Sequence, residues 1–230
     1  PHAPIIPNDE FKGKSAAGPY GDFVYQTDWV AGQVLKALKE KGLEENTIVI
    51  FSADNGPEHY AFDRAEKYGH FSMGEFRGLK RDVWEGGHHV PFIVKWPNRI
   101  KEGSISKEVI SQVDIMATLA YITNSSLPTN AAPDSYNLTA LVKGISYSSP
   151  IREATVHNTN EKIWALRQGK WLYMDGPSGE HSKMPDSFKE LRGYKDFESA
   201  GLLFDMEIDP EQKNNLYNQY PDIIKGMQDI

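Results

Sequence analysis

Two different spacings of apolar residues divide the chain into predicted helices and strands. Apolar side chains recur at helical spacing between Asp22 and Gly42, which predicts an amphipathic helix with Asp22 as its N-cap and Gly42 beyond its end. A second amphipathic helix is predicted from Val109 to Ile122. Both helices lie in the first two-thirds of the sequence.

Two short apolar runs accompany these helices. The β-branched run Thr47–Phe51 predicts a strand buried on both faces, and Val90–Trp96 predicts a second buried strand. Between them, Glu58–Val83 is polar, rich in His and Gly, and weakly periodic. A connection of that length in a compact domain is usually functional or disordered. Helices alternating with buried strands favour an α/β layer.

A change of pattern follows two polar, proline-containing stretches, residues 124–134 and 144–150, which we interpret as linkers. The short runs beyond them predict a small antiparallel lobe, in which Gln168-Gly169 joins two strands as a tight hairpin. We therefore assign residues 1–143 to an α/β domain and residues 144–230 to a small antiparallel-sheet subdomain. The elements expected in the lobe are strands at Ala154–His157, Lys162–Arg167, Lys170–Met174 and Leu202–Phe204, and a closing helix at Pro221–Ile230.

Composition excludes several classes of protein. The 230 residues carry a net charge of −7, and the longest basic run is Lys80-Arg81, which disfavours nucleic acid as a partner. Without cysteine, neither disulfides nor thiolate chemistry is available. No apolar stretch approaches the roughly 20 residues of a membrane span. Because the chain starts at Pro1 and not at Met, we expect a preceding segment that includes any export signal.

Asp54 and Asn55 follow the first predicted strand, at the end where open α/β sheets place ligands. A carboxylate beside an amide oxygen offers two hard donors of the kind that Ca²⁺ or Mg²⁺ takes. The same residues are also common in ordinary turns. The pair alone leaves both interpretations open.

Two cationic side chains are candidates for contact with an anion. Lys80 lies among glycines, and its compact ammonium suits a tetrahedral oxyanion, although a solvated lysine fits the same pattern. His2 lies between prolines that hold the chain extended, and imidazole can donate to an anion or protonate a leaving oxygen. Most of the other histidines are expected to be ordinary surface or hydrogen-bonded residues: His59, His70, His88, His89, His157 and His181.

Taken in order, these elements resemble the sulfatase family of the arylsulfatase type. Each is weak alone, but the ordered set is highly specific and covers about the first 140 residues. The later lobe matches more loosely. The matching segments are Pro1–Pro4, Gly21-Asp22 with Asp28, Ser52–Pro57, Arg77–Lys80, Glu85–His88, Val90–Val94, Trp96-Pro97 and Asp134–Asn137.

The resemblance implies an alkaline-phosphatase-like α/β fold with a small C-terminal antiparallel lobe. It implies a Ca²⁺ site, with Mg²⁺ as the alternative, in which Asp54 and Asn55 are ligands completed by acidic residues of the family's N-terminal half. Lys80 would hold a sulfate oxygen, and His2 would contact the sulfate or assist departure of the alcohol. His70 and His88 are the next candidates for lining the pocket.

The family nucleophile is a formylglycine made from Cys, or sometimes Ser, in a Cys-x-Pro/Ala-x-Arg motif, which this sequence lacks. We expect it in a missing N-terminal part, so this chain alone should be inactive. The intact protein should hydrolyse aryl or sugar sulfates in the periplasm, outside the cell or in the lysosome. His89 stands where the family commonly has Arg, which leaves the substrate open.

Three alternatives remain. Phosphate and sulfate share a tetrahedral geometry, so the intact protein could instead be a phosphatase, phosphodiesterase or phosphonate monoester hydrolase of the same superfold. A non-catalytic module that binds sulfated glycans would use the same basic pocket. The alternative that we favour is that this chain is part of a larger enzyme, because missing first strands would leave sheet edges unpaired.

Overall fold

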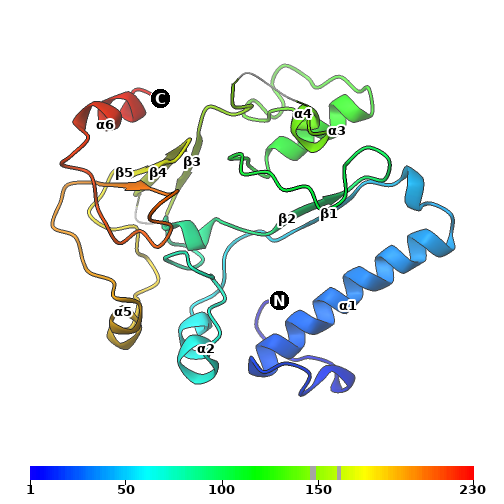
Figure 1. The fold of residues 1–230 in the computed structure, drawn as a ribbon, viewed down its shortest axis with the longest axis horizontal. Coiled ribbons are helices and arrows are strands. Elements are labelled where there is room, and N and C mark those ends of the chain that lie inside the picture. The colour runs from blue at the N-terminus through cyan, green and yellow to red at the C-terminus, as the bar shows by residue number, and fades with distance from the viewer. Residues whose placement is uncertain (146–148, 160–161) are drawn as a thin grey trace.

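The computed structural model describes residues 1–145, 149–159 and 162–230. Two antiparallel sheets organise them: a pair of strands, and a four-stranded sheet in the order β3-β4-β5-β6 (Figure 1). The predicted linker at 144–150 includes residues 146–148, which lie outside the described part. The main elements are α1 (Gly18–Glu40), β1 (Val49–Ser52), α2 (Tyr60–Tyr68), β2 (Phe92–Lys95), α3 (Asp114–Ile122), α4 (Thr139–Val142), β3 (Thr155–Asn158), β4 (Trp164–Gln168), β5 (Trp171–Met174), α5 (Asp186–Arg192), β6 (Leu202–Asp205) and α6 (Pro221–Gln228); short 3-10 turns lie at Asp9–Phe11, Glu44–Asn46 and Glu85–Gly87.

The four-stranded sheet confirms the predicted antiparallel strands. Its side chains alternate between two covered faces, as the two-residue period of a strand requires. Leu166, Tyr173 and Leu203 pack against α6 on one face. Leu172 and Phe204 pack on the other face with Trp84, which comes from the first half of the chain. The domain boundary at 143/144 stays a prediction, although this core already joins the two predicted parts.

The prediction that β1 is buried on both faces and that β2 is a second buried strand is wrong for this chain. The two strands pair antiparallel, with Ser52 opposite Phe92, and one face contacts α3. On the other face Phe51 is 39% exposed and Ile93 61% exposed. Within the described residues no further strand extends this pair, and these side chains of the other face are left partly open to solvent. Helices and sheets are nevertheless mixed as an α/β fold requires.

The long helix α1 begins earlier than predicted, at Gly18. Asp22 is therefore inside the helix and is not its N-cap. Its buried carboxylate accepts hydrogen bonds from the backbone N–H groups of Gly13 and Ser15, both at 2.8 Å, and so fixes the preceding turn. Gly42 does lie beyond the helix end and has a left-handed backbone (φ 68°), as expected of a residue that ends a helix.

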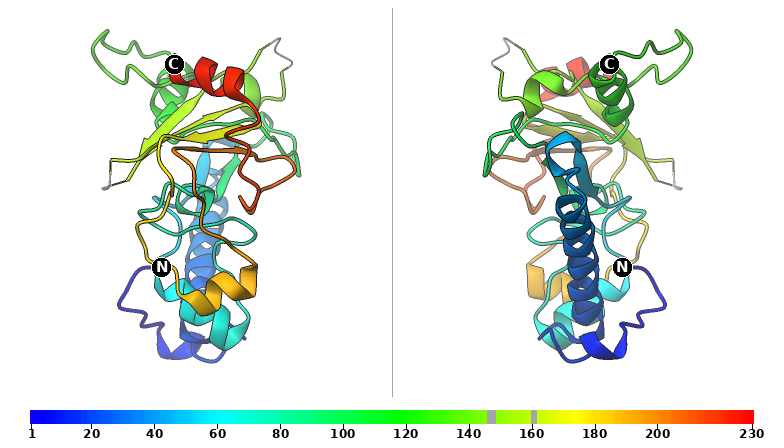
Figure 2. Two further views of the ribbon diagram at one scale, coloured as in Figure 1. Left: turned by 90° about the vertical axis from the view of Figure 1, so that its left-hand side faces the viewer. Right: turned by 90° about the vertical axis from the view of Figure 1, so that its right-hand side faces the viewer.

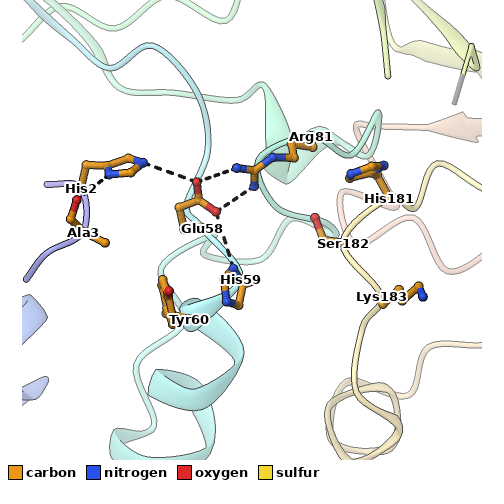
Figure 3. A pocket seen from close by; sticks show the side chains of 9 residues that line it. All are labelled: His2, Ala3, Glu58, His59, Tyr60, Arg81, His181, Ser182 and Lys183. Atoms are coloured by element: carbon orange, nitrogen blue, oxygen red, sulfur yellow. Dashed lines mark hydrogen bonds and ion pairs between the residues drawn. The ribbon is translucent and has the colours of Figure 1, made fainter. Parts of the chain in front are cut away.

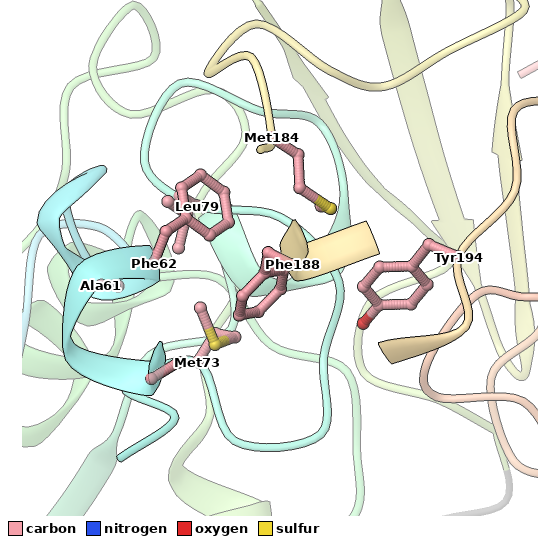
Figure 4. Close-up of a cluster of buried hydrophobic side chains, with 8 residues drawn as sticks. Ala61, Phe62, Met73, Leu79, Met184, Phe188 and Tyr194 are labelled. Atoms are coloured by element: carbon pink, nitrogen blue, oxygen red, sulfur yellow. The ribbon is translucent and has the colours of Figure 1, made fainter. Parts of the chain in front are cut away.

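Helices α2 and α5 were not predicted from the sequence. They lie side by side (Figures 1 and 2) and form a separate core, in which Phe62 and Phe188 have ring centroids 4.8 Å apart (Figure 4). Met184 and Tyr194 complete it from the C-terminal third. The stretch 58–83, expected to be a long loop, is therefore partly helical and is anchored by residues more than a hundred positions later.

Candidate anion-binding site

The turn that follows β1 is held against a second glycine-containing segment. The Gly56 N–H donates to the Gly87 carbonyl at 2.9 Å, and the Lys80 N–H donates to the Pro57 carbonyl at 2.9 Å. A Cβ atom on Gly56 would lie 1.9 Å from the Gly86 carbonyl oxygen, so only glycine permits this approach. The packing places Asp54 and Asn55 on the same short connection that leads to Glu58.

Glu58 is the centre of a cluster of cationic side chains (Figure 3). Its carboxylate lies 3.6 Å from His2 Nε2 and 3.1 Å from Lys80 Nζ. Arg81 donates from both terminal nitrogens, at 2.8 and 3.1 Å. His59 Nδ1 lies 3.7 Å away. The structure thus brings together His2 and Lys80, the two residues predicted to contact the anion, although they are far apart in the sequence.

The charge state of Glu58 follows from these partners. Hydrogen bonds from Arg81, together with Lys80 and against the effect of partial burial, lower the pKa of Glu58 to about 2. The carboxylate is therefore ionised at any physiological pH. It occupies the donors that His2, Lys80 and Arg81 would offer to an external anion, so it marks a position where negative charge is stabilised.

A hollow of about 490 Å³ opens beside this cluster, and one side of it comes from the C-terminal third. Buried Asp82 accepts hydrogen bonds from the backbone N–H groups of His181 and Ser182, at 2.7 and 2.8 Å. The Ser182 hydroxyl donates to the Lys80 carbonyl at 2.9 Å. Figure 3 shows this segment on the side opposite His2. The hollow is lined by His2, Ala3, Glu58, His59, Tyr60, Arg81, His181, Ser182 and Lys183.

His70 and His88, the other two residues predicted to line the pocket, lie outside the hollow. His70 packs near Tyr20 of α1, with ring centroids 6.3 Å apart, and burial together with nearby Arg64 lowers its pKa. The ring of His88 lies against that of His157 from β3, with centroids 3.9 Å apart. Neither is among the residues that line the hollow in the described part of the chain.

His89 replaces the expected Arg without losing a partner. Its Nδ1 lies 2.9 Å from the carboxylate of Glu85, and its ring stacks on Phe76 with centroids 4.1 Å apart. Burial opposes ionisation of Glu85, but the hydrogen bond with His89 and the charge of Arg167 lower the pKa of Glu85 below its ordinary value. The anionic partner is thus present whether or not Arg occupies position 89.

Asp54 and Asn55 offer part of a donor set for a hard cation. The Asp54 side chain is exposed after the end of β1. The Asn55 amide nitrogen donates to the Gly56 carbonyl at 2.8 Å, which leaves its amide oxygen as the ligand atom. One carboxylate and one amide oxygen fit the chemistry of Ca²⁺. Across the described ranges, no group of three or more His, Asp or Glu side chains is arranged to hold a metal ion, so further ligands are needed.

The sequence patterns did not single out Glu58, Arg81 or residues 181–183. Glu58 follows the Asn-Gly-Pro turn directly, and Arg81 adjoins Lys80, so nearness to these motifs was the one available signal. Nothing local in the sequence relates 181–183 to Lys80. That contact depends on the backbone bonds to Asp82 across about a hundred residues.

Comparison with known proteins identifies the family of this chain. The family model described as Sulfatase matches residues 1–125. An N-acetylgalactosamine-6-O-sulfatase of Bacteroides thetaiotaomicron is 35% identical, over 100% of this chain and 44% of its own length. Human arylsulfatase H is 38% identical over 92% of this chain and 39% of its own. The chain belongs to the sulfatase family.

Solved structures show the same fold. A structure from work on glycosaminoglycan metabolism by Bacteroides thetaiotaomicron has a TM-score of 0.81 and 32% identity, over 99% of this chain and 47% of that one. A sulfatase from Pseudoalteromonas sp. has a TM-score of 0.79 at 24% identity, over 100% of this chain and 45% of that one. The chain thus spans less than half the length of these relatives. No helix in the described ranges has the length and apolar character needed to cross a bilayer.

Proposed function

We propose that the full-length protein containing this chain hydrolyses sulfate esters. The observation that carries the proposal is the convergence of His2 and Lys80 on one carboxylate, at 3.6 and 3.1 Å, next to the Asp54–Asn55 turn. A sulfate group has the charge and the oxygen acceptors to take the place of the Glu58 carboxylate among these donors. The alkaline-phosphatase-like fold and the formylglycine nucleophile belong to the same proposal, with the nucleophile supplied from outside this chain.

Lys80 is proposed to bind a sulfate oxygen. Its side chain is only 22% exposed, so its charge is less screened than that of a surface lysine. Its backbone is held to Pro57, which keeps the residue next to the turn. Charge that develops on the sulfuryl oxygens would therefore meet a cation that is already in position.

His2 is proposed to deliver a proton to the departing alcohol oxygen. Its Nδ1 lies 2.8 Å from the Ala3 carbonyl, which can only accept, so Nδ1 carries a hydrogen. In the neutral ring Nε2 is then the nitrogen that takes up a proton and passes it on. His70 and His88 stay candidates for a wider pocket.

Asp54 and Asn55 are proposed to hold Ca²⁺, or Mg²⁺, with acidic residues from the rest of the protein. When bound, the cation would polarise the sulfate and offset its charge. The contribution of this chain is the exposed carboxylate and the amide oxygen, on a turn fixed by Gly56.

For the substrate we propose a sulfated sugar. The support is that the relative covering the whole chain is named an N-acetylgalactosamine-6-O-sulfatase. One of the solved structures, at 18% identity, is described as a complex with D-glucosamine-2-N,6-O-disulfate, although that likeness concerns the fold alone. We also propose a periplasmic, extracellular or lysosomal location, where sulfated glycans occur.

The deciding experiment is turnover by the full-length protein, with its nucleophile converted to formylglycine, on paired sulfate and phosphate esters of the same sugar or phenol. The proposal requires sulfate release that Lys80→Ala abolishes, while Lys67→Ala, an exposed lysine on α2, retains it. Preferred release of phosphate would instead assign the protein to the phosphohydrolases of the same superfold. Retained binding without any turnover would indicate a glycan-binding module.

A further inference from the structure

Two residues that line the hollow have a backbone conformation that side chains disfavour. Arg81 has φ 77° and Lys183 has φ 43°, in the left-handed region that glycine occupies at least cost. Both are long, charged side chains, for which this conformation is uncommon. Strained residues of this kind persist where the surrounding structure forces them, and they concentrate at functional sites.

Backbone hydrogen bonds around Arg81 and Lys183 explain why these two residues keep a left-handed conformation. Asp82, 1% exposed, accepts from the backbone of Leu79 at 2.7 Å and from that of Ser182 at 2.8 Å. The Val83 N–H donates to the Gly179 carbonyl at 2.9 Å. These bonds clamp two segments together immediately beside Arg81 and Lys183. The two cations are thereby presented from separate parts of the chain to one hollow.

The charges in the hollow do not balance. Among the described residues that line the hollow, Arg81 and Lys183 are permanent cations and Glu58 is the one carboxylate. Arg81 uses one N–H of each terminal nitrogen for Glu58, so three of its five donors remain. Lys183 is exposed, and within the described residues it forms no ion pair. Since the whole chain carries −7, this local excess of positive charge is not a general property of its surface.

We propose that Arg81 and Lys183 form a second anion subsite, which binds a sulfate or carboxylate group of the substrate other than the ester that is cleaved. The inference rests on the proposed function, since it takes Lys80 and His2 as the site of the ester. Arg81 would then serve two anions. It binds the Glu58 carboxylate with two of its N–H groups, and its remaining donors face the second anion. Lys183, on a flexible four-carbon stem at the rim, closes around the second anion.

A simpler explanation is that Arg81 only neutralises Glu58. That explanation gives Lys183 no role in the hollow, because Lys183 has no ion-pair partner in the described residues. It also predicts that loss of Lys183 has no effect on ligand affinity. The two explanations therefore differ in a measurable way.

The test uses glycine variants of the full-length protein, Lys183→Gly and Arg81→Gly. Glycine removes the side chain and relieves the left-handed backbone, so the Tm of Lys183→Gly should stay equal or rise by a few degrees. Arg81→Gly gains the same relief but also loses the ion pair with Glu58, so its Tm is expected to be lower than that of Lys183→Gly. Lys162→Gly is the matched control, because Lys162 is an exposed lysine with φ 59° that does not line the hollow. A fall in affinity without a fall in Tm separates ligand contact from a structural role.

Affinities are measured by titration calorimetry with three disaccharides: one monosulfated, one carrying a second sulfate, and one carrying a carboxylate beside the sulfate. Wild type should bind at least one dianion about tenfold more tightly than the monosulfated sugar, and each variant should lose most of that preference. The dianion that shows the preference identifies the group. Equal wild-type affinity for all three sugars, or an equal loss on all three in the variants, would overturn the inference.

Turnover is measured separately on the same sugars. If the protein binds a dianion preferentially but releases no sulfate, the proposed hydrolysis fails and the subsite stands. If it releases sulfate from all three sugars without preference in affinity or KM, the subsite fails and the hydrolysis stands. Failure of one proposal is thus distinguishable from failure of the other.

Discussion

Glu58 and Arg81 form a two-point ion pair, with Nη1 to Oε2 and Nη2 to Oε1 at 2.8 and 3.1 Å. This fork-to-fork geometry is stronger and more directional than a single contact. Because Glu58 also faces Lys80 and His2, the pair determines where negative charge is held in the site.

Glu58→Gln should destabilise the protein by about 1–2 kcal/mol at pH 7, because it leaves clustered cations without a counter-ion. The pKa of Glu58 is lowered from 4.5 to about 2. The stabilisation is therefore complete above pH 4.5 and is lost as the pH falls towards 2. Urea unfolding between pH 2.5 and 7 measures this. Glu66→Gln, on the exposed side of α2, is the control, and an equal effect of both variants would contradict the prediction.

Lys80→Ala should lower kcat of the full-length enzyme by about 10²–10³, the usual effect of removing one group that stabilises developing charge. The effect should fall on kcat more than on KM if the ammonium acts mainly on the transition state. Steady-state release of sulfate measures it. A loss below about fivefold would remove Lys80 from the proposed site.

Removal of calcium should lower the Tm of the full-length protein, and Asp54→Ala should make Tm insensitive to calcium. Free Ca²⁺ at about 100 times its Kd stabilises a folded protein by about 2.7 kcal/mol. Thermal unfolding with calcium and with a chelator tests this without reference to activity. Asp229→Ala, an exposed carboxylate at the end of α6, should keep the calcium response. A full response in Asp54→Ala would exclude this ligand.

Gly56→Ala should destabilise the protein by about 3 kcal/mol or more, because the new methyl group would lie 1.9 Å from the Gly86 carbonyl oxygen. Gly32→Ala offers a contrast on α1, where no atom lies within 4 Å of the added carbon. There the helix should gain about 0.5–1 kcal/mol. Chemical denaturation of both variants gives opposite signs if the approach at Gly56 is as close as described.

His157 should make stability rise with pH in the weakly acidic range. Burial and nearby His88 lower the pKa of His157 from 6.5 to about 4, so the folded protein excludes a proton that the unfolded chain binds. The stabilisation is complete above pH 6.5 and is lost as the pH falls to 4. Unfolding of His157→Gln should lack this component, and NMR titration of the imidazole gives the pKa directly. An unshifted titration near 6.5 would contradict the prediction.

The parts of the fold that were predicted are those with strong local patterns. Helix α1 and the strands β3–β6 follow from regular spacing of apolar residues. The hairpin between β4 and β5 was confirmed, but its turn is Gly169-Lys170, one residue later than predicted, because Gln168 still pairs with Trp171. The helix around Phe62 was missed because His, Gly and charged residues obscure its short apolar face, and its burial depends on Phe188. Strand β1 was predicted correctly in position but wrongly in burial, since an apolar run does not reveal which neighbours cover it.

The residues of the candidate site also fall into two groups: those that the sequence motifs identified and those that only the structure revealed. Lys80, His2, Asp54 and Asn55 were found because motif order relates them, and their roles stay predictions. Glu58 was missed because a single carboxylate after a turn has no signature of its own. The contribution of Ser182 arises from a backbone bond to Asp82 across 100 residues, which no local pattern encodes.

The clamp at Asp82 has a consequence for the order in which the protein is made. Synthesis proceeds from the N-terminus, so the Asp82 carboxylate leaves the ribosome about a hundred residues before the amides of His181 and Ser182. During that interval the loop that carries Lys80 and Arg81 lacks the segment that completes it. Contacts of such large sequence separation are slow to form. A nascent chain arrested before residue 181 therefore contains every residue of the early motifs and still has no finished binding site.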